Sequence, residues 1–377
     1  MGLDINYDAI TIDSCILKGE GYKFDEGLLA LLDQFKDSSI QLVQSDIVHN
    51  EGKNHIAESI KNARAEIAKL LKSAAKHLKI EDKTVDAAKE MLCPEEGDVQ
   101  IAEKRLSQFY EKIGADIIPS DSYVEIARLI QMYFDAEAPF ETGKDKKAEF
   151  PDAIALLSLE NWARQHAIKI LAVSNDVGWK NFAANSEYID VIETLSEAIQ
   201  LFQPHELAND ILLQIQTDVL LNQDNPILDM VQSEIERTIE EAIIHVEAES
   251  FLCFEEDEVY ATYLNHEFVK DDNGLVLVRV VKTQADMIVI EISAKVECEV
   301  TASFSFSVHD SIDRDYVQMG GVTTSIEESF DTEILVTLTG DFGEGFDGVD
   351  VEKVEVLETI SYADFGTVEP DWGDHDD

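Results

Sequence analysis

The sequence is poor in cysteine, proline and glycine, and each shortage excludes a class of protein. Its four cysteines lie far apart and form no CxxC pair, which argues against a zinc knuckle or a disulfide framework. We therefore expect four reduced thiols. Seven prolines and 18 glycines among 377 residues are too few for a collagenous or long disordered chain. Because this length exceeds what one hydrophobic core usually organises, two or three globular domains are expected.

Long apolar runs are also missing. No stretch approaches the roughly 20 apolar residues that span a bilayer, so no membrane contact is expected. The segment from Met1 to Asp13 is acidic and has neither the basic nor the apolar region of a signal peptide. We expect the protein to be cytoplasmic.

Basic side chains are scarce, and their shortage is uneven along the chain. The 29 Lys and Arg against 78 Asp and Glu give a net charge of −49, the wrong sign for gripping nucleic acid over a large surface. Residues 1–190 have a net charge of −12, whereas residues 251–377 have six basic against 31 acidic side chains, a net charge of −25. The last third of the chain therefore holds most of the excess acid.

The first part of the chain alternates predicted strands and helices. A buried strand is predicted at 9–12, a helix at 24–35, a second strand at 40–43 and a helix from Ser45 onward. Residues 53–140 have helical patterns with breaks near Pro94 and Pro119, which we interpret as a helical insertion. A helix from Phe150 to about His166, with proline in its first turn, and strands at 168–174 and 188–191 complete an α/β unit. A mostly parallel sheet is the default architecture for such alternation.

The remainder changes its pattern twice. Apolar residues at helical spacing predict helices over about 206–250, which would connect domains or support oligomerisation. Apolar and polar side chains then alternate at period two in four stretches, 275–281, 287–308, 333–338 and 349–360. This alternation predicts an antiparallel β domain over 251–362, followed by a solvated acidic tail over 363–377.

Acidic residues stand where the strands of the α/β unit are predicted to end. Asp13 ends the first strand, and Asp176 follows the strand at 168–174 by two residues. Glu51 lies in the first turns of the helix after the second strand, and Asp152 begins a later helix. In open α/β sheets, ligands collect outside the carboxyl ends of the strands. Converging carboxylates repel one another unless cations lie between them, and oxygen ligands select hard cations such as Mg²⁺ or Mn²⁺.

Four short motifs at these positions resemble those of the PIN-like nuclease family. They are Thr11–Leu17, Ser45–Glu51, Glu149–Ile154 and Ser174–Asp176. The last two resemble a bacterial subgroup in which a Phe-Pro-Asp-Ala helix start precedes a Val-Ser-x-Asp-x-x-Trp strand end. The resemblance covers about residues 5–205, so we expect residues 1–205 to form a three-layer PIN-like domain.

The resemblance implies a metal-dependent endonuclease, most often an endoribonuclease. Asp13, Glu51, Asp152 and Asp176 would be the catalytic, metal-binding quartet and Ser174 a supporting hydroxyl. RNA is favoured over DNA as the nucleic-acid partner, and a bacterial toxin or defence effector is one expected role. Two alternatives stay open: a structure-selective DNA nuclease, and a non-catalytic interaction or scaffold protein.

Substrate-binding cations are expected near these acids. The helix from Lys53 to Lys79 is the most basic stretch and is a candidate track for the RNA backbone, with a plain surface helix as the alternative. The individual candidates are Lys53, Lys61, Arg64, Lys144, Lys146 and Lys147. His49 and His55 flank Glu51, but helical geometry turns His49 away from Glu51 by about 200°. We expect these histidines to lie at the surface instead of binding a transition metal, and Trp162 and Trp179 to lie in the core.

The acidic C-terminal domain has several expected uses. It would repel nucleic acid and narrow the substrate range, mimic a phosphate backbone and restrain the enzyme, or bind a regulatory protein or another copy of the chain. A plain solubility module is the alternative. Nucleotide-binding signatures such as GxGxxG and GxxxxGK[ST] are absent from the sequence.

Overall fold

The chain divides into two compact units, Met1–Phe202 and Gln203–Asp377, which are described separately. The computed structural model describes residues 7–140, 146–203, 209–221, 223, 225–271, 273–310, 315–342 and 348–371. Within these ranges, none of the helices is both long and apolar enough to cross a membrane.

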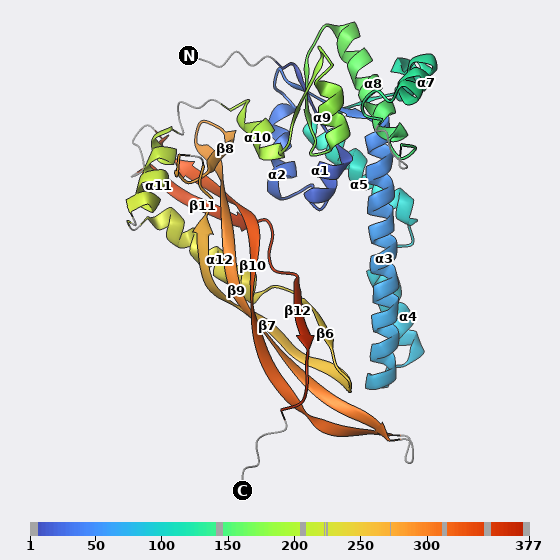
Figure 1. Cartoon of the computed structure of the whole chain (residues 1–377), viewed down its shortest axis with the longest axis vertical. Helices are drawn as coiled ribbons and strands as arrows, with labels where there is room; N and C mark the ends of the chain where they lie inside the picture. The colour runs from blue at the N-terminus through green and yellow to red at the C-terminus, as the bar shows by residue number, and fades with distance from the viewer. Residues whose placement is uncertain are drawn as a thin grey trace. The chain divides into compact units, whose positions relative to one another are not determined.

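The first unit is a parallel sheet covered by helices (Figure 1). Its strands are β1 (Ala9–Ile12), β2 (Gln41–Ser45), β3 (Asp116–Ile118), β4 (Ile170–Val173) and β5 (Ile189–Ile192). They lie in the order β3-β2-β1-β4-β5, and every neighbouring pair is parallel. The central strands β1 and β4 are buried along their whole length, as expected for a sheet covered on both faces. The predicted α/β architecture is confirmed.

The helices of this unit follow the alternation expected from the sequence. They are α1 (Ser14–Gly19), α2 (Gly27–Ala30), the 3-10 helix η1 (Leu31–Phe35), α3 (Asp46–Leu78), α4 (Asp82–Leu92), α5 (Asp98–Ile113), α6 (Ser120–Tyr123), α7 (Ile126–Asp135), α8 (Phe150–His166), α9 (Val177–Ala183) and α10 (Leu195–Gln200). Ser45 caps α3 by accepting a hydrogen bond from Ile47 N at 3.2 Å, and Pro151 occupies the first turn of α8.

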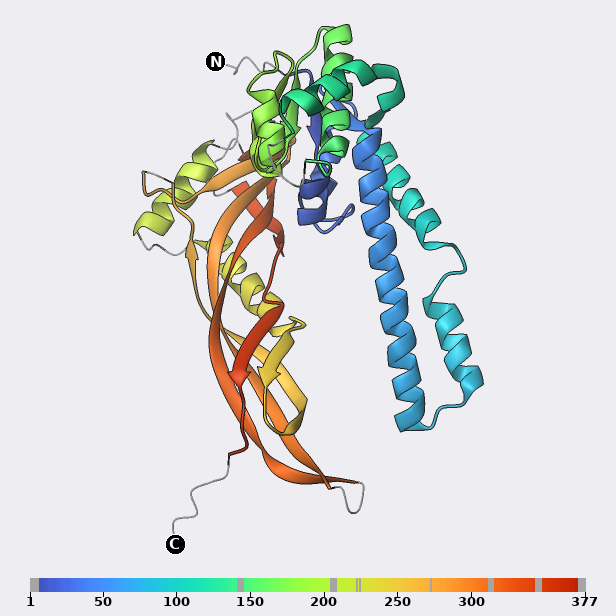
Figure 2. The same cartoon turned by 45° about the vertical axis from the view of Figure 1, so that its right-hand side comes forward.

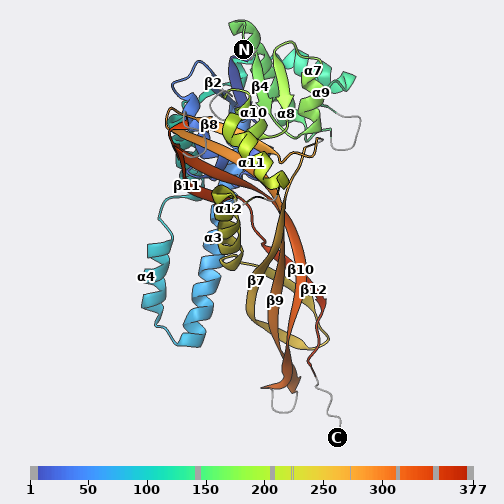
Figure 3. The same cartoon turned by 90° about the vertical axis from the view of Figure 1, so that its left-hand side faces the viewer.

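The helical insertion predicted over 53–140 needs correction. Residues 116–118 form β3, which pairs with β2, and α5 buries Leu106, Phe109 and other apolar side chains. This part of the range therefore belongs to the sheet domain. The region that projects is the hairpin of α4 with the distal half of α3 (Figures 2 and 3). Ala57 is the last buried residue along α3, and α4 has no buried residue.

The second unit contains a long antiparallel sheet. Its elements are α11 (Asn209–Leu221), α12 (Pro226–Glu240), β6 (His245–Glu249), β7 (Cys253–Phe268), β8 (Val278–Thr283), β9 (Met287–Asp310), β10 (Asp315–Gly340), β11 (Val349–Val356) and β12 (Tyr362–Thr367). The strand order is β11-β10-β9-β7, with β8 also pairing with β9. The predicted antiparallel domain is confirmed, with one parallel pair, β6 with β12, beside it.

Two segments of this unit, residues 245–249 and the start of the predicted tail, differ from the sequence-based expectation. The buried apolar sides of α11 and α12, including Ile215 and Ile235, pack into the core of the sheet. Residues 245–249 form a strand instead of a helix. The predicted tail begins with β12, whose Ala363 is fully buried because it pairs with β6. Residues 372–377 of that tail lie outside the described residues.

Two apolar clusters lie along the same β9–β10 strand pair. The larger joins residues such as Ile290, Ile292 and Val336 to the two helices. The smaller consists of Ala302, Phe304, Phe306 and Val368, with partly buried side chains from β6 and β12 around it. One continuous ladder of strand pairing therefore connects two separate cores.

Candidate active site

Asp13 lies directly after β1 at the carboxyl edge of the parallel sheet. Its backbone N–H donates to Val173 O at 3.0 Å, which places it beside the end of β4. The side chain is 3% exposed, and its Oδ2 accepts hydrogen bonds from Ser174 Oγ at 2.7 Å and Cys15 Sγ at 2.9 Å. A buried carboxylate with two donors on one oxygen has a fixed position.

Asp176 stands at the same edge and caps α9. Its Oδ1 accepts from Gly178 N at 2.7 Å and from Trp179 N at 3.2 Å. Its own N–H donates to Ser174 Oγ at 3.1 Å, so one hydroxyl bonds both Asp13 and the backbone of Asp176. The glycine is required here, because a Cβ on Gly178 would lie 2.9 Å from Asp176 Oδ1.

Asp152 lies in the first turn of α8 and is held by a tryptophan. Its Oδ1 accepts a hydrogen bond from the indole Nε1 of the fully buried Trp179 at 2.9 Å. Burial is the main cause that raises the pKa of Asp152 to about 6, and the negative charges of Asp13, Asp176 and Glu51 raise it further. The indole hydrogen bond acts in the opposite direction. Three carboxylates from other elements therefore act electrostatically on this one.

Glu51 reaches the site from the second turn of α3, where it is partly buried. Its charge also acts on Tyr22, whose pKa is raised to about 12, first by burial and then by Glu51. The Tyr22 hydroxyl is hydrogen-bonded to His55 Nδ1 at 2.9 Å. The charge of Glu51 therefore acts both on Asp152 and on Tyr22.

The donor chemistry of these four residues fits a hard divalent cation. Carboxylates and a hydroxyl offer only oxygen ligands, and the pKa of Asp152 is raised first by burial and then by neighbouring negative charge, which a cation would offset. Among the described residues, no group of three or more His, Cys, Asp or Glu side chains is arranged so that it could hold a metal ion. The charges of the other three acids act on Asp152, and three of the four acids, Asp13, Asp152 and Asp176, accept hydrogen bonds from protein donors.

A side-chain amide holds the end of β1 in place. Backbone pairing of β1 with β2 stops at Ile10 and Leu42. Beyond it, Gln44 Nε2 donates to Ile12 O at 2.7 Å, and Gln44 Oε1 accepts from Thr11 Oγ1 at 3.1 Å and Ile12 N at 3.4 Å. The buried amide therefore replaces the peptide group of a neighbouring strand, one residue before Asp13.

Three contributors were not identified as such from the sequence: Cys15, Gln44 and the indole N–H of Trp179. Burial and the neighbouring Asp13 raise the pKa of Cys15 to about 11, so its thiol stays protonated and donates to the carboxylate. Trp179 was expected in the core and is there, but it also bonds Asp152. The available sequence signal for the role of Trp179 was its spacing, three residues after Asp176 at the start of α9.

The cations predicted to bind substrate have different surroundings. Arg64 donates to Pro94 O and Glu96 O at 2.9 and 2.7 Å and pairs with Asp98 at 3.0 Å, so it fastens the turn before α5. Lys53 lies 3.4 Å from Glu103.

The other predicted cations are less engaged. Lys61 and Lys147 are exposed, and Lys146 lies over the Tyr133 ring at 4.6 Å from its centroid. Lys144 lies outside the described residues.

His49 is not a surface residue, contrary to the prediction. It is 8% exposed, and its Nε2 lies 3.2 Å from Glu103 Oε1, while its Nδ1 is buried. The ring also packs against Tyr110 at 5.7 Å between centroids. Helix α3 turns this side chain toward α5 and away from the acids, as the angular separation from Glu51 implied.

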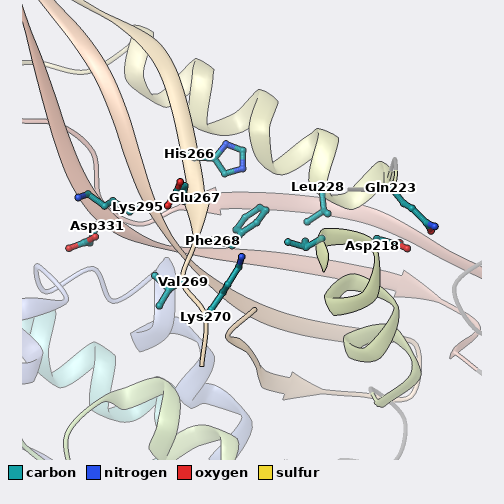
Figure 4. A pocket seen from close by; sticks show the side chains of 11 residues that line it. Asp218, Gln223, Leu228, His266, Glu267, Phe268, Val269, Lys270, Lys295 and Asp331 are labelled. Atoms are coloured by element: carbon teal, nitrogen blue, oxygen red, sulfur yellow. The ribbon is translucent and has the colours of Figure 1, made fainter. Parts of the chain in front are cut away.

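A cavity in the second unit has a different character. About 690 Å³ in volume, it lies between the end of β7 and helices α11 and α12, and Lys270 and Phe268 line it (Figure 4). Its buried carboxylate, Asp218, accepts hydrogen bonds from Gln214 and Asn225 at 2.8 and 2.7 Å. These bonds give Asp218 a structural function in connecting the two helices.

Comparison with known protein families gives a match for the first unit. A family model described as PIN domain matches residues 10–179, which include Asp13, Glu51, Asp152 and Asp176. Comparisons with curated proteins and with solved structures found no match. The match identifies the domain, and the subgroup with the Phe-Pro-Asp-Ala helix start stays a prediction.

Proposed function

Because residues 10–179 form a PIN domain, and such domains are generally metal-dependent nucleases, we propose that this chain is a metal-dependent endonuclease acting on RNA in preference to DNA. The observation that carries the proposal is the Ser174 hydroxyl, which bonds both the Asp13 carboxylate and the backbone of Asp176 and so holds these two acids at one edge of the sheet. Mg²⁺ or Mn²⁺ is the proposed cofactor, because all four ligands are carboxylates.

Each residue has a proposed part in the reaction. Asp13, Glu51, Asp152 and Asp176 would hold the cofactor, which would supply Lewis acidity for water activation and neutralise charge on the phosphate. Ser174 and Cys15 fix Asp13, and the indole of Trp179 orients Asp152. Substrate positioning against these fixed groups supplies the rest of the rate acceleration.

The test is cleavage of labelled RNA and of single-stranded DNA of the same sequence, in competition, with Mg²⁺ or Mn²⁺. We expect RNA to be cut faster, and Asp13→Asn or Asp176→Asn to abolish cutting. Asp116→Asn, on the exposed strand β3, is the matched control and should retain activity. Full activity of Asp176→Asn would contradict the proposed site, and preferred cutting of DNA would contradict the RNA assignment.

We further propose that the acidic β unit restrains the nuclease, as a toxin or defence effector would require. Acidic side chains recur on β9 and β10: Glu297 is exposed, and Glu299 lies directly opposite the exposed Glu327. Such a face repels nucleic acid, or competes with nucleic acid for the basic side chains that bind it. A binding site for a regulatory protein or another copy of the chain is proposed on this face.

The restraint is best tested in the full chain. A truncation near Glu249 would remove the sheet from α11 and α12, whose apolar sides it covers. Changing Glu297, Glu299 and Glu327 to Gln leaves the core intact, since Glu297 and Glu327 are exposed and Glu299 is partly exposed. Faster RNA cleavage than the parent chain is expected, and unchanged or slower cleavage would contradict the restraint.

A further inference from the structure

The first unit also has a pocket, and it lies near the acidic site. It has a volume of about 590 Å³ and is formed by residues 21–26, after α1, and by one face of α5. Three cations, Lys23, Arg105 and Lys112, line it together with two acids, Asp25 and Glu26. Among 78 acidic and 29 basic side chains, a pocket with three cations stands out as a place for a negatively charged ligand.

Two of these cations are held in position by the protein. Arg105 and Lys112 are seven residues apart on α5, so they lie on the same face two turns apart. Arg105 donates to Tyr22 O at 3.2 Å and lies 5.7 Å from the centroid of the Phe24 ring. Lys112 donates to Phe24 O at 3.0 Å. Cations that are already oriented lose less conformational entropy when an anion binds.

One wall of the pocket connects it to the acidic residues. Tyr22 lines the pocket, and its hydroxyl bonds His55, one helical turn beyond Glu51 on α3. A Cβ built on Gly52 would lie 3.7 Å from Tyr22 Cε1, so the ring contacts the residue next to Glu51. The charge of Glu51 raises the pKa of Tyr22, which also indicates their proximity. Tyr22 therefore both lines the pocket and packs against α3 beside Glu51.

We propose that this pocket binds a backbone phosphate of the nucleic-acid strand, on a nucleotide neighbouring the one that is cleaved. The inference rests on the proposed nuclease function and adds a subsite to it. Lys112 now pairs with Asp25 at 3.1 Å, but the Asp25 side chain is 95% exposed. A surface pair of this kind contributes little to stability, so a phosphate can replace Asp25 as the partner of Lys112.

The test measures binding of a fluorescein-labelled single-stranded RNA of mixed sequence to the full chain carrying Asp176→Asn, by fluorescence anisotropy at several salt concentrations with Mg²⁺ present. Adding Arg105→Gln and Lys112→Gln should weaken binding at least tenfold at low salt. The slope of log affinity against log salt should become shallower by about 0.7, since the pocket holds one phosphate and each phosphate contact to a single strand contributes about 0.7. Adding Asp25→Asn instead should tighten binding, because it removes the competing acid.

Controls separate the pocket from folding and from overall charge. Lys83→Gln with Lys89→Gln removes two exposed cations from α4 and should leave the affinity nearly unchanged. If the pocket double variant unfolds at a lower temperature, Asp25→Asn still tests the inference, because its expected effect is tighter binding, which a loss of folding would not produce. Unchanged affinity in Asp25→Asn together with an unchanged salt slope in the double variant would overturn this inference alone. If the unmodified chain neither binds nor cleaves RNA or DNA, the proposed function itself fails.

Discussion

The indole N–H of Trp179 donates a hydrogen bond to Asp152 Oδ1 at 2.9 Å, from a ring that is completely buried. The bond stabilises the charged carboxylate and so counteracts the burial and the neighbouring negative charges that raise its pKa to about 6. A residue expected only to fill the core therefore also keeps an acidic group of the site ionised.

Trp179→Phe removes the N–H and should raise the pKa of Asp152 above 6. Because a cation is bound by the charged carboxylate, metal affinity and activity should fall more at pH 6 than at pH 8. The measurement is the pH dependence of Mg²⁺-dependent cleavage, whose acid limb should move to higher pH. The control is Trp162→Phe, which changes a buried tryptophan on α8 and leaves the Trp179 bond to Asp152 in place. Equal losses at both pH values would show that the bond does not govern ionisation.

Ser174→Ala should separate Asp13 from its main donor. The hydroxyl is fully buried and bonds Asp13 Oδ2 and Asp176 N, so its loss frees both. We expect metal affinity or cleavage to fall about 10- to 100-fold, as for other groups that orient metal ligands. Ser158→Ala removes an equally buried hydroxyl that bonds only Ala155 O and should leave the metal dependence unchanged.

Gln44→Leu should destabilise the first unit and disturb the site together. The change leaves the buried N–H and carbonyl of Ile12 without their side-chain partner, at a cost of about 1–3 kcal/mol for each unsatisfied group. Urea unfolding measures the loss, and Mg²⁺ titration of cleavage measures the shift at Asp13. Gln41→Leu, on the same strand but exposed, is the control. A destabilised variant with a normal Mg²⁺ requirement would restrict Gln44 to a structural role.

Glu327→Gln should stabilise the second unit. Glu327 lies directly opposite Glu299 in the β9–β10 pairing, and like charges in that position are destabilising. The expected gain is about 0.2–1 kcal/mol, decreasing as salt screens the repulsion. Thermal unfolding at low and high salt measures it, with Glu352→Gln on β11 as the control. A gain that does not depend on salt would point to a cause other than charge.

The sequence predicted best what depends on local pattern. The buried strands β1 and β4 have continuous apolar runs, and the acids at their ends come directly after them, so Asp13 and Asp176 were assigned to one sheet edge. Their shared bonds to Ser174 are consistent with that prediction. Proline in the first turn likewise indicated where α8 begins.

Elements without an apolar run were missed. Strand β3 has three residues, two of them exposed, and four of the first six residues of β7 are acidic. Both are defined by pairing with a neighbour and not by their own side chains. The same holds for β12, which the acidic composition of the C-terminal segment concealed. Contacts such as Trp179 with Asp152 depend on helix packing and have no local signature.

The strand pair β9–β10 passes through two apolar clusters of unequal size, and this predicts uneven opening along one ladder. Amide hydrogens near Ile290 and Ile292 are sheltered by the large cluster and the helices, whereas those near Phe304 and Phe306 depend on the small one. Local opening free energy follows the apolar contacts that are lost. The amides near Phe304 and Phe306 should therefore exchange with deuterium earlier than those near Ile290 and Ile292. A single hairpin would then have two different exchange lifetimes.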